Sequence, residues 1–550
     1  MDFNSQKPNE SNRNLLIAVL VSALVLVGAD YVRLRFFPAP VQQVAQTQQG
    51  AVVAESQSPG APAAPMVMAQ PVQQAIKTVR LPLQSSTMEG GVALEGARID
   101  QLVLPRYKNS VSDQTPVTMF TPSGDPVFFF EAGWQGQGVA TPTPTSTWTA
   151  ETPRLSPDTP LVLTWKNDQG LTFQRTYELA DDSYTIHVTD MVSNDGSKAV
   201  TIGHFAQLHR GMGADELKKA EKLSTFTHPV GPELLFDSNH IVHNYKDLLK
   251  NGSSTEVGRN GWAGISTPYF LAALIPDQST NTSATFRTSN GNGKTYFSLD
   301  MQEPEVTIQP GAYVEKTYRL FAGPKVISLL QKEGVGLEQA VDYGWYHVIA
   351  KMFYSALMFM NNLLGNLGLA IIVTTLLIKV ALWPLAAKSY RAMSELKKLQ
   401  PKMEQVRAKY GDQREKVAAE MMALYRQHKV NPASGCWPVL IQIPIFFAFY
   451  KVILISIEFR QAPFFGWIVD LSSKDPLYVL PILMGITMFV QQRLNPPAAD
   501  PVQQKVMQMM PILFTFMFMG FPSGLVLYWT TNSLLSLGQQ YLVMRRMGLK

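Results

Sequence analysis

The stretch LGLAIIVTTLLIKVALWP, from Leu367 to Pro384, is apolar over nearly the length of a membrane helix and contains one charged residue, Lys379. About 20 such residues cross a bilayer as an α-helix. A charge at bilayer depth costs at least about 2.5 kcal/mol, so it usually marks a functional site. The stretch therefore predicts a membrane helix with Lys379 as its candidate functional residue.

The composition divides the chain into an aqueous part and a membrane part. Of the 550 residues 46% are hydrophobic and only 16% are charged, below the share of about a quarter in soluble domains. After residues 15–29 no long apolar run occurs until about residue 348, and from there such runs recur up to residue 543. The single cysteine, Cys436, cannot form an internal disulfide. The large part outside the membrane must therefore rely on a packed core.

Six segments are apolar enough to be predicted as membrane spans. The fourth and fifth are short, and they require local thinning of the bilayer or flanking polar residues that reach outward. The first has a second interpretation, because Val27-Gly28-Ala29 is typical of the cleavage site of a removed signal peptide. The segments are Leu15–Val32, Leu363–Leu385, Val439–Ile457, Leu477–Val490, Met510–Phe521 and Gly524–Val543.

Lysine and arginine in the short loops set the expected orientation. Segment 386–430 carries eleven of them against five acidic residues, and further basic residues precede the first span and follow the sixth. We therefore expect this segment and both termini, 1–13 and 546–550, in the cytoplasm. The domain after the first span is then exported.

The exported part begins with a linker and continues as a predicted β domain. Residues 33–78 are rich in Pro, Gln and Ala, a composition that cannot bury a core. Within 79–340, apolar and polar residues alternate from Tyr184 to Thr189, as in a half-buried strand, and Asn-Gly pairs punctuate the region at 290–293. We predict an antiparallel β-sandwich.

Six histidines of this domain and its paired carboxylates form no recognisable catalytic or metal-binding pattern. His240 and His243 have a permissive spacing, but no Cys or carboxylate pattern completes a ligand set. We therefore predict structural or surface histidines, and no enzyme, metal or cofactor.

Residues 341–362 crowd aromatic side chains at one end, which is typical of a helix in the membrane interface, although the start of a longer span is also compatible. The pair Asn361-Asn362 favours an interface helix, after which the core 363–545 begins.

Apolar residues in 386–430 recur at spacings of three and four on both sides of Gly411-Asp412, which predicts an antiparallel helical hairpin. Its basic faces suit anionic lipid head groups or ribosomal RNA, but a solvated face that only enforces topology explains the charge equally well. Flexible methionines suit contact with varied apolar sequences. The candidate contact residues are Met393, Lys397, Lys398, Met403, Met421 and Met422.

Lys379 lies five residues before Pro384, so its ammonium could snorkel to the cytoplasmic surface. However, side chains tilt toward the N-terminus of a helix, and this helix is expected to enter from outside, so Lys379 should lean toward the bilayer centre. No acidic partner occurs in the spans, and polar residues in spans face protein or water. A hydrated cavity is therefore predicted around Lys379, Thr375, Gln442, Tyr528, Trp529, Asn532, Ser536 and Gln539.

Several long motifs resemble the YidC/Oxa/Alb family of membrane protein insertases, and the whole arrangement is similar to the YidC proteins of Gram-negative bacteria. The motifs are KVALWPL at 379–385, LQPKMEQVRAKYGD at 399–412, EMMALYRQHKVNPASGCWPVLIQIPIFFAFY at 420–450, FRQAPFFGWIVDLSSKDPLYVLPILMG at 459–485 and FPSGLVLYWTTNSLLSLGQQ at 521–540.

The resemblance implies a polytopic α-helical protein of the inner membrane, with six spans, a five-helix insertase core, a cytoplasmic hairpin and a periplasmic β-supersandwich. It implies a groove lined by Thr375, Lys379, Tyr528 and Trp529, in which the family usually has arginine where Lys379 stands. Nascent membrane proteins are the implied substrates, alone or with the Sec translocon and the ribosome. Membrane lipids are further partners, DNA is not, and a monomer is expected.

Two other functions are compatible with an intramembrane lysine. A small-solute transporter would use it to bind an anion, but transporters usually show paired halves with broken helices, and the sequence has no such repeat. A structural scaffold or chaperone for other translocation components would not need the lysine at all.

Overall fold

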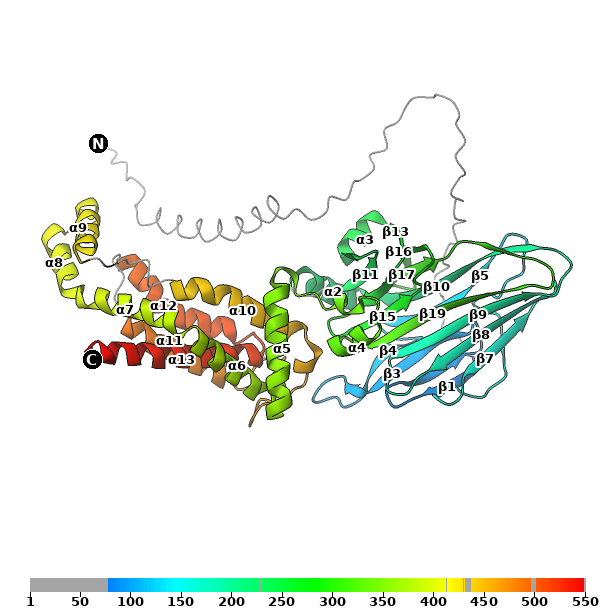
Figure 1. The fold of residues 1–550 in the computed structure, drawn as a ribbon, viewed down its shortest axis with the longest axis horizontal. Coiled ribbons are helices and arrows are strands. Elements are labelled where there is room, and N and C mark those ends of the chain that lie inside the picture. The colour runs from blue at the N-terminus through cyan, green and yellow to red at the C-terminus, as the bar shows by residue number, and fades with distance from the viewer. Residues whose placement is uncertain are drawn as a thin grey trace, which may run out of the picture. The chain divides into compact units, whose positions relative to one another are not determined.

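Strands occupy the first half of the described chain and helices the second half (Figure 1). The structure is a computed structural model, and it describes residues 78–226, 230–411, 413–428, 430, 437–495 and 501–548. The predicted N-terminal tail, the first span and nearly all of the linker lie outside these residues, as does Cys436.

The β domain contains two antiparallel sheets, so the predicted sandwich is confirmed. In the described residues one sheet has ten strands and the other nine. The first sheet runs β1 (Arg80–Gln84), β2 (Glu89–Ala93), β3 (Arg98–Lys108), β5 (Val127–Gln135), β10 (Val200–Met212), β17 (Lys294–Gln302), β16 (Thr282–Gly291) and β13 (Ser253–Gly258), with β4 (Pro116–Phe120) beside β3 and β18 (Val306–Ile308) beside β10. The second runs β12 (Asn239–Val242), β11 (Gly231–Phe236), β14 (Trp262–Ser266), β15 (Phe270–Ile275), β19 (Tyr313–Pro324), β9 (Thr185–Asn194), β8 (Leu171–Leu179), β7 (Leu161–Lys166) and β6 (Thr149–Ala150).

The strand signal and one of the two turn signals appear where they were expected, whereas Asn290-Gly291 belongs to β16 and Thr185, expected on the polar side of its strand, is buried. In β9, Ile186 and Val188 are buried while His187 between them is exposed. The pair Asn292-Gly293 joins β16 to β17 with positive φ at both residues, +49° and +71°. Two such residues form the tight turn whose twist matches that of the flanking strands.

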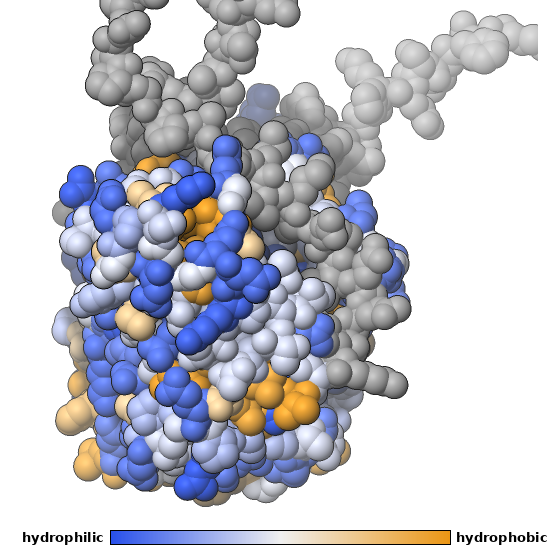
Figure 2. All heavy atoms as spheres, turned by 90° about the vertical axis from the view of Figure 1, so that its right-hand side faces the viewer, coloured by the Kyte–Doolittle hydropathy of each residue, from blue (hydrophilic) through white to orange (hydrophobic). Residues whose placement is uncertain are grey.

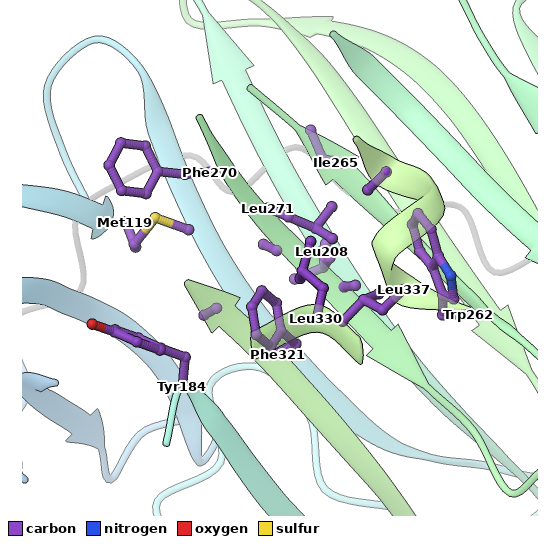
Figure 3. Packing of buried hydrophobic residues seen from close by; sticks show 14 of the residues in the cluster. Met119, Tyr184, Leu208, Trp262, Ile265, Phe270, Leu271, Phe321, Leu330 and Leu337 are labelled. Atoms are coloured by element: carbon purple, nitrogen blue, oxygen red, sulfur yellow. The ribbon is translucent and has the colours of Figure 1, made fainter. Parts of the chain in front are cut away.

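The core of the domain lies between the two sheets. Leu208 of β10 belongs to the first sheet, and Leu271 of β15 and Phe321 of β19 belong to the second, and all three meet in one buried cluster (Figure 3). The face of the domain in Figure 2 is mostly hydrophilic, with small separate hydrophobic areas. Burial between the sheets, at about 25 cal/mol for each Å² of apolar surface, is thus the main source of stability in this part of the chain.

The described part of the β domain also contains three helices, of which two lie between strands and the third follows the last strand, β19. They are α2 (Ala214–Phe226), α3 (Tyr245–Asn251) and α4 (Ile327–Lys332). Just before α2, the backbone N–H of Gly213 donates to Asp125 Oδ1 at 2.8 Å, a contact between residues far apart in the sequence. Leu330 of α4 is fully buried in the core cluster, so α4 is held by tertiary packing rather than by its own length.

A buried charge network crosses the sandwich. Arg175 on β8 donates to both carboxylate oxygens of Asp190 on β9, at 2.6 and 3.1 Å. The second oxygen also accepts from Tyr318 at 2.9 Å and lies 3.0 Å from His204 Nε2. Because Asp190 and Arg175 are essentially inaccessible to water, each charge depends on the other.

We expect Asp190→Asn to lower the free energy of unfolding of the β domain by about 3 kcal/mol, because Arg175 is left buried without its counter-charge. Asp182→Asn is the matched control, since Asp182 also pairs with an arginine, Arg106, but is 69% exposed. Asp182→Asn should lower the free energy of unfolding only slightly, because an exposed ion pair contributes little to stability. Thermal unfolding of the full-length protein in detergent, followed by far-UV circular dichroism, measures both, and equal effects would contradict the prediction.

The same network sets an acid limit for the fold. Burial alone would raise the pKa of Asp190, but Arg175 and His204 outweigh it and lower the pKa to about 2. A depressed pKa stabilises the folded state fully above the unfolded pKa of about 3.9, and this contribution is lost as pH falls toward 2. The wild-type transition should therefore move to lower temperature across that window, and the Asp190→Asn variant should show a smaller shift.

The helical part begins where the sandwich ends, after short 3-10 turns at Leu337–Ala340 and Gly344–Tyr346. Another 3-10 turn, Ile457–Phe459, follows the helix α10. The α-helices are α5 (His347–Leu364), α6 (Leu367–Ala381), α7 (Trp383–Lys398), α8 (Gln400–Tyr410), α9 (Arg414–Gln427), α10 (Trp437–Ile455), α11 (Val479–Leu494), α12 (Pro501–Phe518) and α13 (Ser523–Arg546).

The segment 363–385 is not one straight helix. Gly365 ends α5 with a φ of +68°, and the side chain of Asn366 caps α6 by accepting from the Leu369 N–H at 3.0 Å. At the other end α6 stops at Ala381 and α7 leaves at an angle of 68°. Pro384 in the first turn of α7 explains the break, because its ring excludes a continuous helix through Val380.

Length and hydropathy indicate which of the described helices could cross a membrane. None of the helices there is by itself both long and apolar enough to cross a membrane, whereas α6 and α7 meet the requirement as a bent pair.

Helices α8 and α9 pack against each other on either side of Gly411, whose φ is +50°. They share a small apolar cluster formed by Leu396, Leu399, Met403, Met421 and Val430, flanked by Val406, Val417, Leu424 and Tyr425. These residues include most of the apolar positions that the sequence spacing singled out.

Candidate functional site

Lys379 lies on the last turn of α6, half-buried, and its ammonium reaches across to α13. Nζ donates to Ser536 Oγ at 2.7 Å, and the backbone carbonyl of Lys379 accepts from the Gln539 amide at 3.2 Å. Ser536 in turn donates to the Asn532 carbonyl one turn earlier, at 2.8 Å. The charge is therefore held by neutral polar groups of α13.

Among the residues that the structure describes, Lys379 forms no ion pair within 4.0 Å. A hydroxyl satisfies one of the three donors of an ammonium but does not neutralise its charge. A protonated Lys379 at this site is therefore solvated by neutral groups and has no counter-charge among the described residues.

Two threonines of α6 accompany Lys379. Thr375, one turn earlier, is buried and its hydroxyl donates to the Ile371 carbonyl at 2.6 Å. Its hydroxyl is thus used within its own helix. The buried Thr374 Oγ1 has no hydrogen-bond partner in the described part of the chain.

A second polar contact joins α10 to α13. The Gln442 amide donates to the hydroxyl of Tyr528, whose side chain is 1% exposed. The Tyr528 ring also stacks on Phe449 of α10, with centroids 4.3 Å apart and planes at 11°. Tyr528 is therefore fixed both at its hydroxyl and at its ring.

The polar row on α13 starts at Tyr528, not at Trp529. Tyr528, Asn532 and Ser536 are spaced by four and share one face, and all are buried. The half-buried Trp529 packs instead against Phe446 of α10 and Phe518 of α12, at 4.9 and 5.5 Å between ring centroids.

The two polar contacts do not touch each other. Lys379 meets α13 at Ser536 and Gln442 meets it at Tyr528, two helical turns or about 12 Å apart along the axis. Tyr528, Asn532 and Ser536 thus form a row along one face of α13, and Trp529 lies outside this row. Sequence spacing revealed this face, but Phe449 and Phe446 were missed because an aromatic residue in an apolar helix carries no polar signal.

Large apolar side chains are exposed on both α10 and α12. On α10 they are Ile443 and Phe447, and on α12 they are Met509, Ile512, Leu513, Phe516 and Met517. Such a surface is unfavourable in water and suits contact with lipid or with another apolar helix.

The candidate contact residues on α7 to α9 separate into two groups. Met403 and Met421 are buried in the apolar cluster of these helices. Lys398 and Met422 are exposed, and Met393 and Lys397 are half-buried.

Two histidines of the β domain lie within hydrogen-bond distance of carboxylates. His240 Nε2 lies 3.0 Å from Glu233 and His209 Nε2 lies 3.0 Å from Glu131. Across the described residues, no group of three His, Cys, Asp or Glu side chains is placed to hold a metal ion.

Two family profiles cover almost all of the described chain. The profile described as "60Kd inner membrane protein" matches residues 359–550, and that of the "YidC periplasmic domain" matches residues 80–356. A protein of Rhizobium meliloti (strain 1021) named "Membrane protein insertase YidC" is 34% identical over 98% of this chain and 97% of its own length. The chain belongs to the YidC family of membrane protein insertases.

Other YidC proteins also match most of the chain. The YidC of Methylobacterium nodulans is 38% identical over 98% of this chain and 95% of its own. A solved structure titled as an active YidC insertase with its first transmembrane domain resolved covers 86% of this chain and 95% of its own, at 19% identity and a TM-score of 0.38. The β domain is the periplasmic domain of this family, and the family is not enzymatic.

We expect Tyr528→Phe to lower the free energy of unfolding by about 1 kcal/mol, because the half-buried Gln442 amide loses its acceptor while ring stacking on Phe449 is kept. Tyr541→Phe on the same helix is the control, since Tyr541 is 56% exposed. Thermal unfolding in detergent compares the two. Identical midpoints for both variants and the parent would show that the Gln442 contact contributes nothing.

Proposed function

We propose that this protein inserts and folds nascent membrane proteins in the inner membrane, and that Lys379 lies at the floor of a hydrated groove that receives them. The observation that carries the proposal is the position of Lys379, a half-buried cation among apolar helices with a serine hydroxyl as its partner. Membership of the YidC family supports the insertase activity.

The proposed topology has six spans with both termini and segment 386–430 in the cytoplasm and domain 79–340 in the periplasm. Helices α6, α10, α11, α12 and α13 correspond in position to the second to sixth predicted spans. In this arrangement α5 lies in the periplasmic interface, α8 and α9 form the cytoplasmic hairpin, and the excess of lysine and arginine in 386–430 supports the orientation.

The proposed mechanism uses the charge of Lys379 and the apolar surfaces beside it. The cation and the polar row Tyr528, Asn532 and Ser536 attract the polar or acidic exported segment of a substrate part-way across the bilayer. This shortens the path over which that segment is dehydrated. The apolar segment of the substrate then moves along α10 and α13 into lipid, driven by hydrophobic transfer, and no covalent step or nucleotide is required.

The basic surface of α7 to α9 suggests further partners besides the substrate. The exposed basic side chains of α7 to α9 suit anionic lipid head groups or the RNA of a translating ribosome. We propose that the protein works alone or beside the Sec translocon.

Lys379→Ala should lower the insertion of a single-span substrate with an acidic exported segment at least about tenfold, because the fixed charge is lost from the site. Lys379→Arg should retain most of the activity, since it keeps the charge. Lys388→Ala is the control, because Lys388 is an exposed basic residue of the neighbouring α7. Protease protection of the substrate in proteoliposomes with purified protein gives the readout.

Insertion by Lys379→Ala at the parental rate would end the proposed role of the cation. Flux of a small anion through the same proteoliposomes without any nascent chain, lost in Lys379→Ala, would instead favour a transporter.

A further inference from the structure

An unbroken row of rings links the interfacial helix α5 to the polar contact of Tyr528. Phe353 of α5 packs on Phe449 of α10 with centroids 4.7 Å apart, and Phe449 stacks on Tyr528 of α13 at 4.3 Å. All three side chains are at most 4% exposed. Rings packed this closely cannot move independently.

Tyr354, the next residue of α5, makes a separate contact with the turn that follows α10. Tyr354 Oη donates to Glu458 Oε1 at 2.6 Å, just after the end of α10. Upstream of α5, the Tyr343 hydroxyl lies 3.2 Å from Ser456 Oγ. The Phe353–Phe449 contact thus joins α5 to α10 directly, and the other two contacts join Tyr354 and Tyr343 to the turn that follows α10. Of these three contacts, only that of Phe353 belongs to the row that ends at Tyr528.

The contact between Gln442 and Tyr528 needs such support. Gln442 lies two residues before Pro444, which removes a backbone hydrogen bond inside α10 and loosens the helix there. Phe449 lies seven residues after Gln442, on the same side of α10 and beyond the proline. It contacts the Tyr528 ring from the intact part of the helix.

We propose that Phe449 and Phe353 are positioning residues for insertion: they hold the Tyr528 ring where its hydroxyl meets Gln442, and so make the polar face of α13 depend on the docking of α5. Neither residue touches the substrate in this arrangement. The inference rests on the proposed role of the Tyr528 hydroxyl, and it adds that a helix at the periplasmic interface controls that hydroxyl.

The alternative is that the three rings only stabilise the fold. Both interpretations predict a lower thermal midpoint for a variant that loses a ring. Only the positioning role also predicts a slower insertion per folded molecule, and only when the Tyr528 hydroxyl is present to be misplaced. This difference makes a double-mutant cycle decisive.

The test compares Phe353→Leu, Tyr528→Phe and the double variant of the full-length protein in proteoliposomes. The initial insertion rate is divided by the amount of folded protein, which thermal unfolding in detergent establishes. Each single variant should slow insertion about fivefold, and the double variant should be no slower than Tyr528→Phe. Phe359→Leu is the matched control, because Phe359 is 65% exposed on the same helix and should insert at the parental rate.

Rates that multiply in the double variant would overturn the positioning role, as would a parental rate in Phe353→Leu. If Phe353→Leu does not fold, Phe353→Met keeps more of the ring's length and takes its place in the cycle. A parental rate in Tyr528→Phe would overturn both this inference and the role of the hydroxyl, whereas the proposed role of the cation depends on Lys379→Ala alone.

Discussion

The charge of Lys379 is the constraint on which the helical part depends. An ammonium among apolar helices is costly unless polar groups replace its water, and the described chain offers Ser536 of α13. A serine hydroxyl satisfies a donor without cancelling the charge. The face of α13 that bears Ser536 must therefore turn inward, and Asn532 and Tyr528 turn inward with it, because they follow at intervals of four.

The face of α13 that bears Trp529 packs against aromatic side chains instead of polar groups. Here Phe446, Phe514 and Phe518 surround the indole with ring contacts of 4.9 to 6.5 Å. Adjacent residues of one helix point in directions about 100° apart. Tyr528 therefore belongs to the polar row of α13, whereas Trp529 belongs to its aromatic contacts. One helix thus carries both a polar face and an apolar one.

Sequence patterns predicted the features that depend on local spacing. The alternation in β9, the turn at Asn292-Gly293 and the apolar positions of α8 and α9 all follow from periods of two or from spacings of three and four. The helices of the β domain and the stacking of Phe449 on Tyr528 were not predictable in this way. They depend on contacts between residues far apart in the sequence, which no local period encodes.

The candidate site was accessible to sequence reasoning because polar residues are rare in apolar helices. Lys379, Gln442 and Ser536 stood out for that reason. The hydrogen-bond partner of each residue could not be predicted from the sequence. The pairing also bears on the arginine that the family resemblance implies at position 379. A guanidinium carries five donors in a planar fork and needs several acceptors in one plane, whereas an ammonium is a compact point charge on a flexible stem. A single hydroxyl on a neighbouring helix therefore suits lysine better than arginine.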